Sequence, residues 1–106
     1  MQMISMPEDS PAQAAFLMDG DYMAPYIRRG EIVTVEWALP EQGQCGLFSL
    51  DGNTLVRQYC EDSFGNIYLF VLDRSHPDMD ITVPAGSHPV CLGRLLLDKI
   101  PPLPLY

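Results

Sequence analysis

Two residues in this chain have side chains whose types and spacing raise the question of catalysis, Tyr22 and Arg57. Tyr22 lies within the hexapeptide Gly-Asp-Tyr-Met-Ala-Pro at residues 20–25, and Arg57 follows it by 35 residues. A phenol hydroxyl becomes a nucleophile only when a nearby base removes its proton. Arginine stays protonated in proteins and therefore cannot act as that base. The residue types therefore predict no nucleophile–base pair at these two positions.

Other pairings of reactive side chains carry little signal. His88 and Cys91 form a conceivable thiol–imidazole pair, but their spacing is not diagnostic of catalysis. Lys99 is the only lysine, and neither Ser49 nor Ser63 has a lysine close to it in the sequence. No set of His, Cys, Asp or Glu has metal-ligand spacing, and no glycine-rich phosphate loop is present. The sequence therefore predicts no cofactor and no metal.

The hexapeptide resembles the Gly-Asp-Ser-Met-x-Pro box of the LexA-like, phage-repressor-like self-cleaving serine peptidases. The position of the family's nucleophilic serine holds Tyr22 here. Further segments resemble the family in their order and spacing, and the resemblance covers roughly residues 14–97. They are Arg29–Val33, Gly46–Phe48, Leu55–Tyr59, Leu69–Pro77 and Val90–Leu95.

The resemblance implies a peptidase fold without peptidase chemistry. Arg57 lies where the family carries the lysine of its Ser–Lys dyad, so both dyad positions are replaced. The residues before the box contain no Ala-Gly dipeptide of the kind that the family cleaves. We expect no catalytic residue here, and we expect Tyr22 and Arg57 to fill the former cleft. The remaining motif residues, which we expect to shape a turn, are Gly20, Asp21, Met23 and Pro25.

Composition limits the classes of partner. The chain of 106 residues carries 14 acidic and 6 basic residues, a formal charge of -8, so its surface repels the phosphates of nucleic acids. The three cysteines, Cys45, Cys60 and Cys91, show no Cys-x-x-Cys pattern and are expected to be reduced. No apolar run is long enough to span a membrane, and residues 1–9 do not resemble a signal peptide. We expect a cytoplasmic location.

Closely spaced prolines and glycines between β-branched and aromatic runs predict short strands and an all-β fold. The resemblance specifies it as a LexA/signal-peptidase-like fold of coiled β-ribbons with one short helical turn. The predicted domain spans residues 14–98, after a lead-in at 1–13 and before a proline-rich tail at 99–106 that forms neither helix nor central strand. The helical turn is expected at 22–29, with Met23, Tyr26 and Ile27 on one face. Strands are expected at 14–19, 31–37, 45–50, 54–60, 67–72, 79–83 and 90–97.

The resemblance implies the self-association domain of a phage-repressor-like transcription regulator. Such a domain would bring separate helix-turn-helix modules to two half-sites, so this chain would meet DNA only indirectly. Leu95, Leu96 and Leu97 must point to both faces of their strand, so one face is expected to contribute to a homodimer interface together with Leu103 and Tyr106. Two alternatives stay open: a self-cleaving peptidase with another nucleophile, and a protein- or peptide-binding module that acts on an intact repressor.

Overall fold

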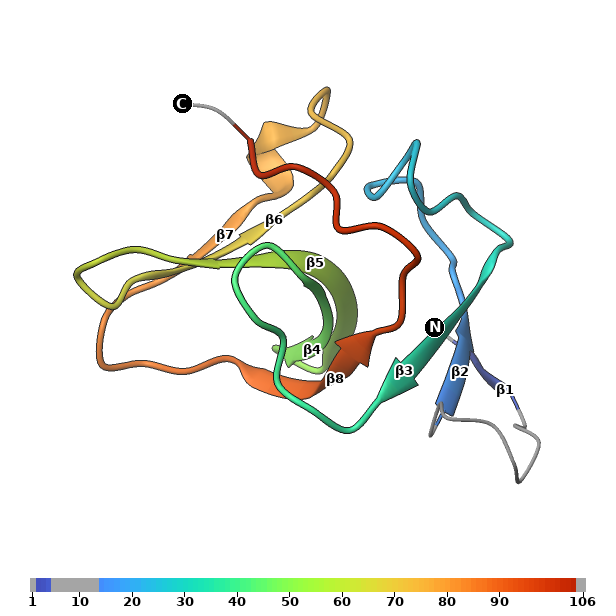
Figure 1. Cartoon of the computed structure of the whole chain (residues 1–106), viewed down its shortest axis with the longest axis horizontal. Helices are drawn as coiled ribbons and strands as arrows, with labels where there is room; N and C mark the ends of the chain where they lie inside the picture. The colour runs from blue at the N-terminus through green and yellow to red at the C-terminus, as the bar shows by residue number, and fades with distance from the viewer. Residues whose placement is uncertain (1, 5–13, 105–106) are drawn as a thin grey trace.

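The chain folds into one antiparallel sheet, as the sequence predicts for an all-β protein. The computed structural model describes residues 2–4 and 14–104 (Figure 1). Its sheet has eight strands in the order β1-β2-β3-β8-β4-β5-β6-β7. The strands are β1 Gln2–Ile4, β2 Ala14–Leu17, β3 Ile32–Glu36, β4 Cys45–Leu50, β5 Asn53–Glu61, β6 Ile67–Phe70, β7 Ile81–Val83 and β8 Val90–Leu95.

The predicted strands all occur, most of them shortened at one or both ends, and β4 matches its predicted bounds. The tight hairpin between β4 and β5 forms at Asp51 and Gly52, whose φ angles of 50° and 79° are left-handed. Two consecutive residues with positive φ give the type I′ turn, whose twist matches that of the flanking strands. The Asp-Gly dipeptide therefore sets the register that pairs Cys45 with Gln58.

The segment at 22–29, expected to hold a helical turn, makes a single hydrogen-bonded turn. The Met23 carbonyl oxygen accepts from the amides of Tyr26 and Ile27, and the second of these is an i to i+4 bond, but the turn does not continue into a helix. Pro25 explains this, because a proline disfavours helical backbone at the residue before it and has no amide hydrogen to donate. Tyr26 is exposed rather than on the buried face. In the described residues the helical element is instead η1, a 3-10 helix at Pro77–Met79, in a segment expected to be a loop and the start of a strand.

The N-terminal lead-in contains a strand that the sequence analysis missed. β1 pairs antiparallel with β2, with Met3 opposite Phe16. A segment of three residues carries too little sequence pattern to predict a strand, and β1 is a strand because it pairs with β2. The rest of the predicted lead-in, residues 5–13, lies outside the described residues.

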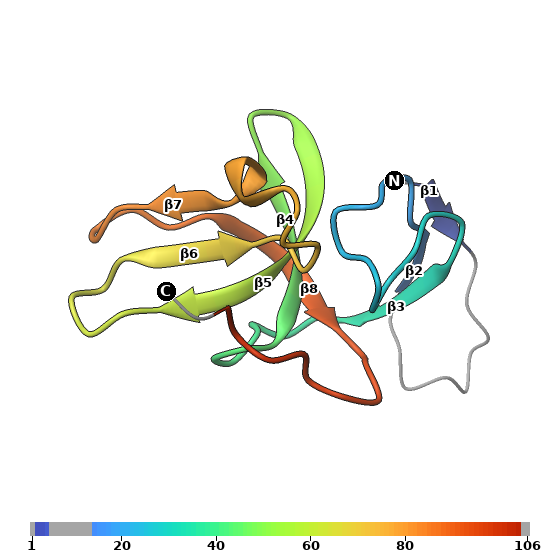
Figure 2. The ribbon, with the colours of Figure 1, turned by 90° about the horizontal axis from the view of Figure 1, so that it is seen from above.

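Two hydrophobic clusters lie on the two sides of the coiled sheet. β4 contributes to both, because successive side chains of a strand point to opposite faces: Leu47 enters one cluster and Phe48 the other. The first cluster joins β3, β4, β5 and β8 to the turn that carries Met23 and Ile27. Figure 2 shows the hairpins β2–β3 and β5–β6 extending to opposite ends of the molecule. The first cluster therefore fixes the turn at 20–30 against β5.

The proline-rich tail runs back across β5 without forming helix or strand through residue 104, as expected (Figure 1). Gln58, which is fully buried, donates through Nε2 to the carbonyl oxygens of Gly43 and Pro101, at 3.0 and 2.7 Å. These bonds hold the tail over one face of β5. Among the described residues no helix is long and apolar enough to cross a membrane.

Candidate functional site

A cleft of about 510 Å³ opens between the turn at 19–22 and the first half of β5. The first cluster positions both walls, since Met23 packs into it from the turn and Val56 from β5. The cleft is the place where Tyr22 and Arg57 meet. It is lined by Asp19, Gly20, Asp21, Tyr22, Arg29, Thr54, Leu55, Val56, Arg57 and His76.

The structure brings Tyr22 and Arg57 together. The central guanidinium carbon of Arg57 lies 5.5 Å from the centre of the Tyr22 ring, within the range of a cation–π interaction. The rings of Tyr22 and His76 are nearly perpendicular, at 87°, with their centres 5.4 Å apart. The Tyr22 carbonyl oxygen accepts a hydrogen bond from the backbone amide of Asp73. The Tyr22 ring therefore contacts both Arg57 and His76.

Arg57 is buried, with only 3% of its surface exposed. Its Nη1 donates to the carbonyl oxygen of Val56 at 2.8 Å, while its Nε is buried without an acceptor in the described structure. Desolvation lowers the pKa of the guanidinium, and the charges of Tyr22 and Asp80 oppose that shift. Arginine starts from so high a pKa that it remains a cation even when its pKa falls.

The motif residues around Tyr22 differ in what they do. Met23 is fully buried in the first cluster, and the Ala24–Pro25 peptide bond is cis. Asp21 accepts from the backbone amide of Arg29 and pairs with its side chain at 3.6 Å, which closes the turn. A Cβ placed on Gly20 would meet the Tyr22 ring at 3.8 Å, an ordinary contact, so local geometry does not require glycine there.

His88 and Cys91, considered above as a thiol–imidazole pair, make no hydrogen bond to each other. Both line a hollow between β8 and the loop after β3, but the Cys91 thiol contacts the carbonyl oxygen of Gly93 at 3.6 Å. Burial raises the pKa of Cys91, which disfavours the reactive thiolate. Burial also raises the pKa of the Cys45 thiol, to about 12. Within the described residues no group of three His, Cys, Asp or Glu side chains is placed to hold a metal ion.

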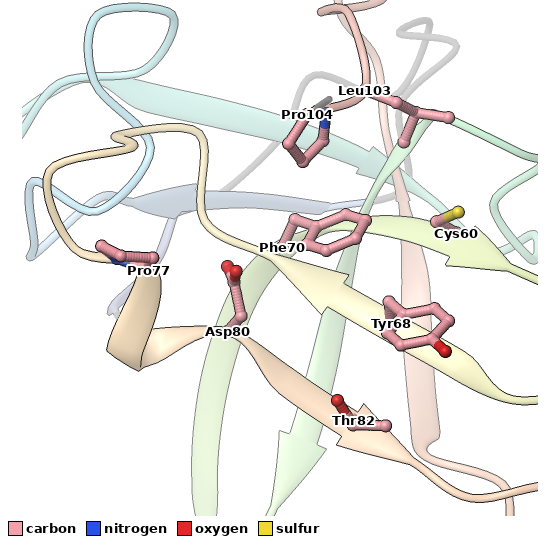
Figure 3. A pocket seen from close by; sticks show the side chains of 8 residues that line it. All are labelled: Cys60, Tyr68, Phe70, Pro77, Asp80, Thr82, Leu103 and Pro104. Carbon is pink, nitrogen blue, oxygen red and sulfur yellow. The ribbon is translucent and has the colours of Figure 1, made fainter. Parts of the chain in front are cut away.

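A second and larger hollow, of about 640 Å³, was not expected from the sequence (Figure 3). We call it the aromatic groove. Its floor is the outer face of β5, β6 and β7, where Tyr68 lies opposite both Cys60 and Thr82. The rings of Tyr68 and Phe70 stack at 5.8 Å and 6°. The full lining is Cys60, Tyr68, Phe70, Pro77, Asp80, Thr82, Leu103 and Pro104.

The polar groups around the aromatic groove are engaged. Asp80 accepts from the Val71 amide at 2.8 Å and forms two hydrogen bonds of 2.9 Å with Arg74. The Tyr68 hydroxyl donates to Asp62 at 2.9 Å. The continuous apolar run at 67–72 predicted only a buried strand. The sequence feature that could have indicated the aromatic groove was the pair of aromatic residues at positions 68 and 70, because a strand places residues two apart on the same face.

Most of the leucines proposed as an interface pack against other residues of the same chain. Leu95 is 5% exposed in the first cluster, and Leu97 packs against that cluster, while Leu96 is exposed. Leu103 is half-buried in the aromatic groove wall, and Tyr106 lies outside the described residues. Two apolar side chains beyond β3 are more exposed, Trp37 at 57% and Leu39 at 75%.

Comparison with protein-family models, with curated proteins and with solved structures finds no match to this chain.

Proposed function

We propose that this chain is a catalytically inactive domain of the LexA-like peptidase fold that works by binding. The observation that carries the proposal is the contact of Tyr22 with Arg57. The sequence resemblance places these residues at the nucleophile and base positions of a dyad, which requires them to meet although they are 35 residues apart. Neither residue can perform the role of the one it replaces, because the phenol is too large and the guanidinium cannot accept a proton.

The composition of the cleft supports an inactive site. Among the described residues that line it there is no serine, cysteine or lysine. Thr54 supplies a hydroxyl and His76 is the histidine of the lining, but no hydrogen bond joins the two, and the His76 ring packs against Tyr22. A hydroxyl without an aligned base is a poor nucleophile near neutral pH.

Incubation of the purified chain at mildly alkaline pH, followed by intact-mass spectrometry, tests this inactivity. We expect an unchanged mass over days. Self-cleavage that is lost in Tyr22→Phe would contradict the proposal and favour a peptidase with an unrecognised nucleophile. As a positive test, the double variant Tyr22→Ser with Arg57→Lys is expected to cleave a supplied Ala-Gly peptide.

The binding activity that we propose is self-association, as in the dimerisation domain of a phage-repressor-like regulator whose DNA-binding module is separate. Its support is the exposure of large apolar side chains beside β8. A Cβ on Gly93 would lie 3.3 Å from the Trp37 ring, and Leu39 lines a hollow with Pro89 and Cys91. Apolar side chains clustered on a surface are typical of protein interfaces.

Sedimentation velocity at rising protein concentration tests self-association. We expect a dimer that Leu39→Glu dissociates. Phe64→Glu is the matched control, because Phe64 is 82% exposed in the β5–β6 turn, away from β8. A monomer at high micromolar concentration, or a dimer that only Phe64→Glu disrupts, would argue against this surface.

A further inference from the structure

Arg57 is a buried cation for which the described structure supplies no counter-charge. No described carboxylate lies within ion-pair distance of it, and the guanidinium is held by one carbonyl oxygen and one aromatic ring. Asp80 influences its pKa from a distance but is itself paired with Arg74. A buried charge without a hydrogen-bonded partner costs several kcal/mol as an order of magnitude. A group that supplies the missing negative charge would therefore bind with a favourable contribution.

Arg57 lines the cleft, and one of its nitrogens lacks a partner. Nη1 donates to the Val56 carbonyl oxygen, whereas Nε is buried without an acceptor. Nε and Nη2 lie on the same edge of a guanidinium and form a planar fork that matches the two oxygens of a carboxylate. The Tyr22 ring contacts the group, with its centre 5.5 Å from the guanidinium carbon. Because Nε is buried, a carboxylate reaches this edge only when the side chains that cover it shift.

The other charges of the cleft limit the ligand to a single negative charge. Asp21 is paired with Arg29, Asp19 lies at the same wall, and His76 contacts Asp73. Because Arg29 compensates Asp21, the Asp19 carboxylate and the formal charge of -8 on the chain are what disfavour a phosphate dianion or a polyanion. A monoanionic carboxylate on an otherwise uncharged, extended peptide meets both limits, and a cleft of about 510 Å³ holds a short peptide segment.

We propose that the cleft binds a peptide carboxylate, with Arg57 as its bidentate receptor and Tyr22 as the ring that holds the guanidinium in place. The carboxylate comes either from a peptide C-terminus or from an Asp or Glu side chain, since both present the same two oxygens. The proposal goes beyond the function proposed above, and it requires neither self-association nor a peptidase ancestor. It requires only that Arg57 lie buried and unpaired at the cleft.

NMR of the 15N-labelled chain tests the proposal directly through the arginine Nε–H resonances. The probes are sodium acetate and the peptide acetyl-Gly-Ala-Val, with the C-terminal amide of the same peptide as the neutral control. We expect a saturable shift of the Arg57 resonance, with a dissociation constant of the order of 1 mM. The peptide acetyl-Gly-Glu-Gly-amide distinguishes a side-chain carboxylate from a C-terminal one. No saturable shift with any carboxylate, or an equal shift with the neutral amide, would overturn the proposal.

Variants assign the effect to the guanidinium. Arg57→Lys keeps a positive charge but removes the fork, so binding should weaken about tenfold or more. Arg57→Met should abolish binding. Arg28→Met changes the net charge equally at an exposed arginine outside the cleft lining and should leave binding unchanged. If Arg57→Met does not give a folded spectrum, Arg57→Lys decides alone. Equal weakening by Arg28→Met would mean that only net charge matters and would contradict the proposal.

Discussion

The cleft at Tyr22 and the aromatic groove at Tyr68 are built on opposite rules. In the aromatic groove two polar side chains are paired: Asp80 with Arg74 and the Val71 amide, and the Tyr68 hydroxyl with Asp62. In the cleft, the Nε of Arg57 is buried without an acceptor; the other such atom among the described residues, Gln58 Oε1, lies outside both linings. Native proteins leave few buried polar groups unsatisfied, and those few commonly coincide with function. The contrast indicates that the groove contributes to stability and that the cleft gives up stability at a binding position.

The largest effect is expected from Asp80→Ala in the aromatic groove. The Val71 amide and the Arg74 guanidinium would both lose their acceptor, at a cost of about 2–3 kcal/mol in the free energy of unfolding. Asp21→Ala is the matched change in the cleft. The Asp21–Arg29 pair is largely exposed, so this change should cost less than about 1 kcal/mol. Urea unfolding measures both, and equal losses would remove the distinction between the two regions.

A smaller loss, about 1–2 kcal/mol, is expected from Gln58→Met, because two carbonyl oxygens lose their donor. The tail that forms one wall of the groove should then detach from β5. Trypsin cleavage after Lys99 reports the detachment and should become faster in the variant. Gln42→Met, at an exposed glutamine whose amide reaches the Glu61 carbonyl, is the control and should leave that cleavage rate unchanged.

The strands were predictable because their signals are local. Asp51-Gly52 specified a hairpin, and a β-branched run specified β3. What was missed depends on tertiary context, since β1 is a strand only because β2 pairs with it. The alternation predicted for β5 placed Arg57 and Gln58 on opposite faces, but it did not show that both faces are covered there, one at the cleft and the other by the tail.

For the cleft, the sequence predicted which two residues meet, Tyr22 and Arg57, but not how deeply they are buried or which hydrogen bonds they make. Burial of the guanidinium and the missing acceptor for its Nε are properties of the assembled sheet and turn. Three consecutive leucines do not reveal which of them the core takes: Leu95 lies in the first cluster and Leu97 packs against it. A homodimer interface on the other face stays a prediction. The aromatic groove was missed because its wall comes from the tail, more than 30 residues from Tyr68 and Phe70 along the chain.

Replacing Arg57 in the cleft and Arg74 at the aromatic groove by methionine should change the free energy of unfolding in opposite directions. Arg57→Met removes a buried, unpaired cation and keeps an unbranched apolar chain, so we expect stabilisation of about 1 kcal/mol. Arg74→Met breaks two hydrogen bonds to Asp80 and a contact with the Phe70 ring, so we expect destabilisation of about 1 kcal/mol. Thermal unfolding in parallel measures both signs. A clear loss of stability in Arg57→Met would mean that the cation is better satisfied than its contacts indicate.

The smallest effect concerns acid stability at the Tyr68 end of the groove. Hydrogen bonds from the Asn66 side chain, the Tyr68 hydroxyl and the backbone of the β5–β6 turn hold the pKa of Asp62 below its ordinary value. A carboxylate with a lowered folded pKa stabilises the fold at pH values above its unfolded pKa of about 3.9, and this contribution is lost as the pH falls through the folded pKa.

The melting temperature of the wild type should therefore fall more between about pH 5 and pH 2.5 than that of Asp62→Asn, which keeps the side-chain oxygen but cannot titrate. Asp98→Asn, in the exposed segment after β8, should keep the wild-type pH dependence. Parallel curves for wild type and Asp62→Asn would show that the turn is held without the charge of Asp62. The hydrogen bonds around Asp62 would then contribute through geometry alone.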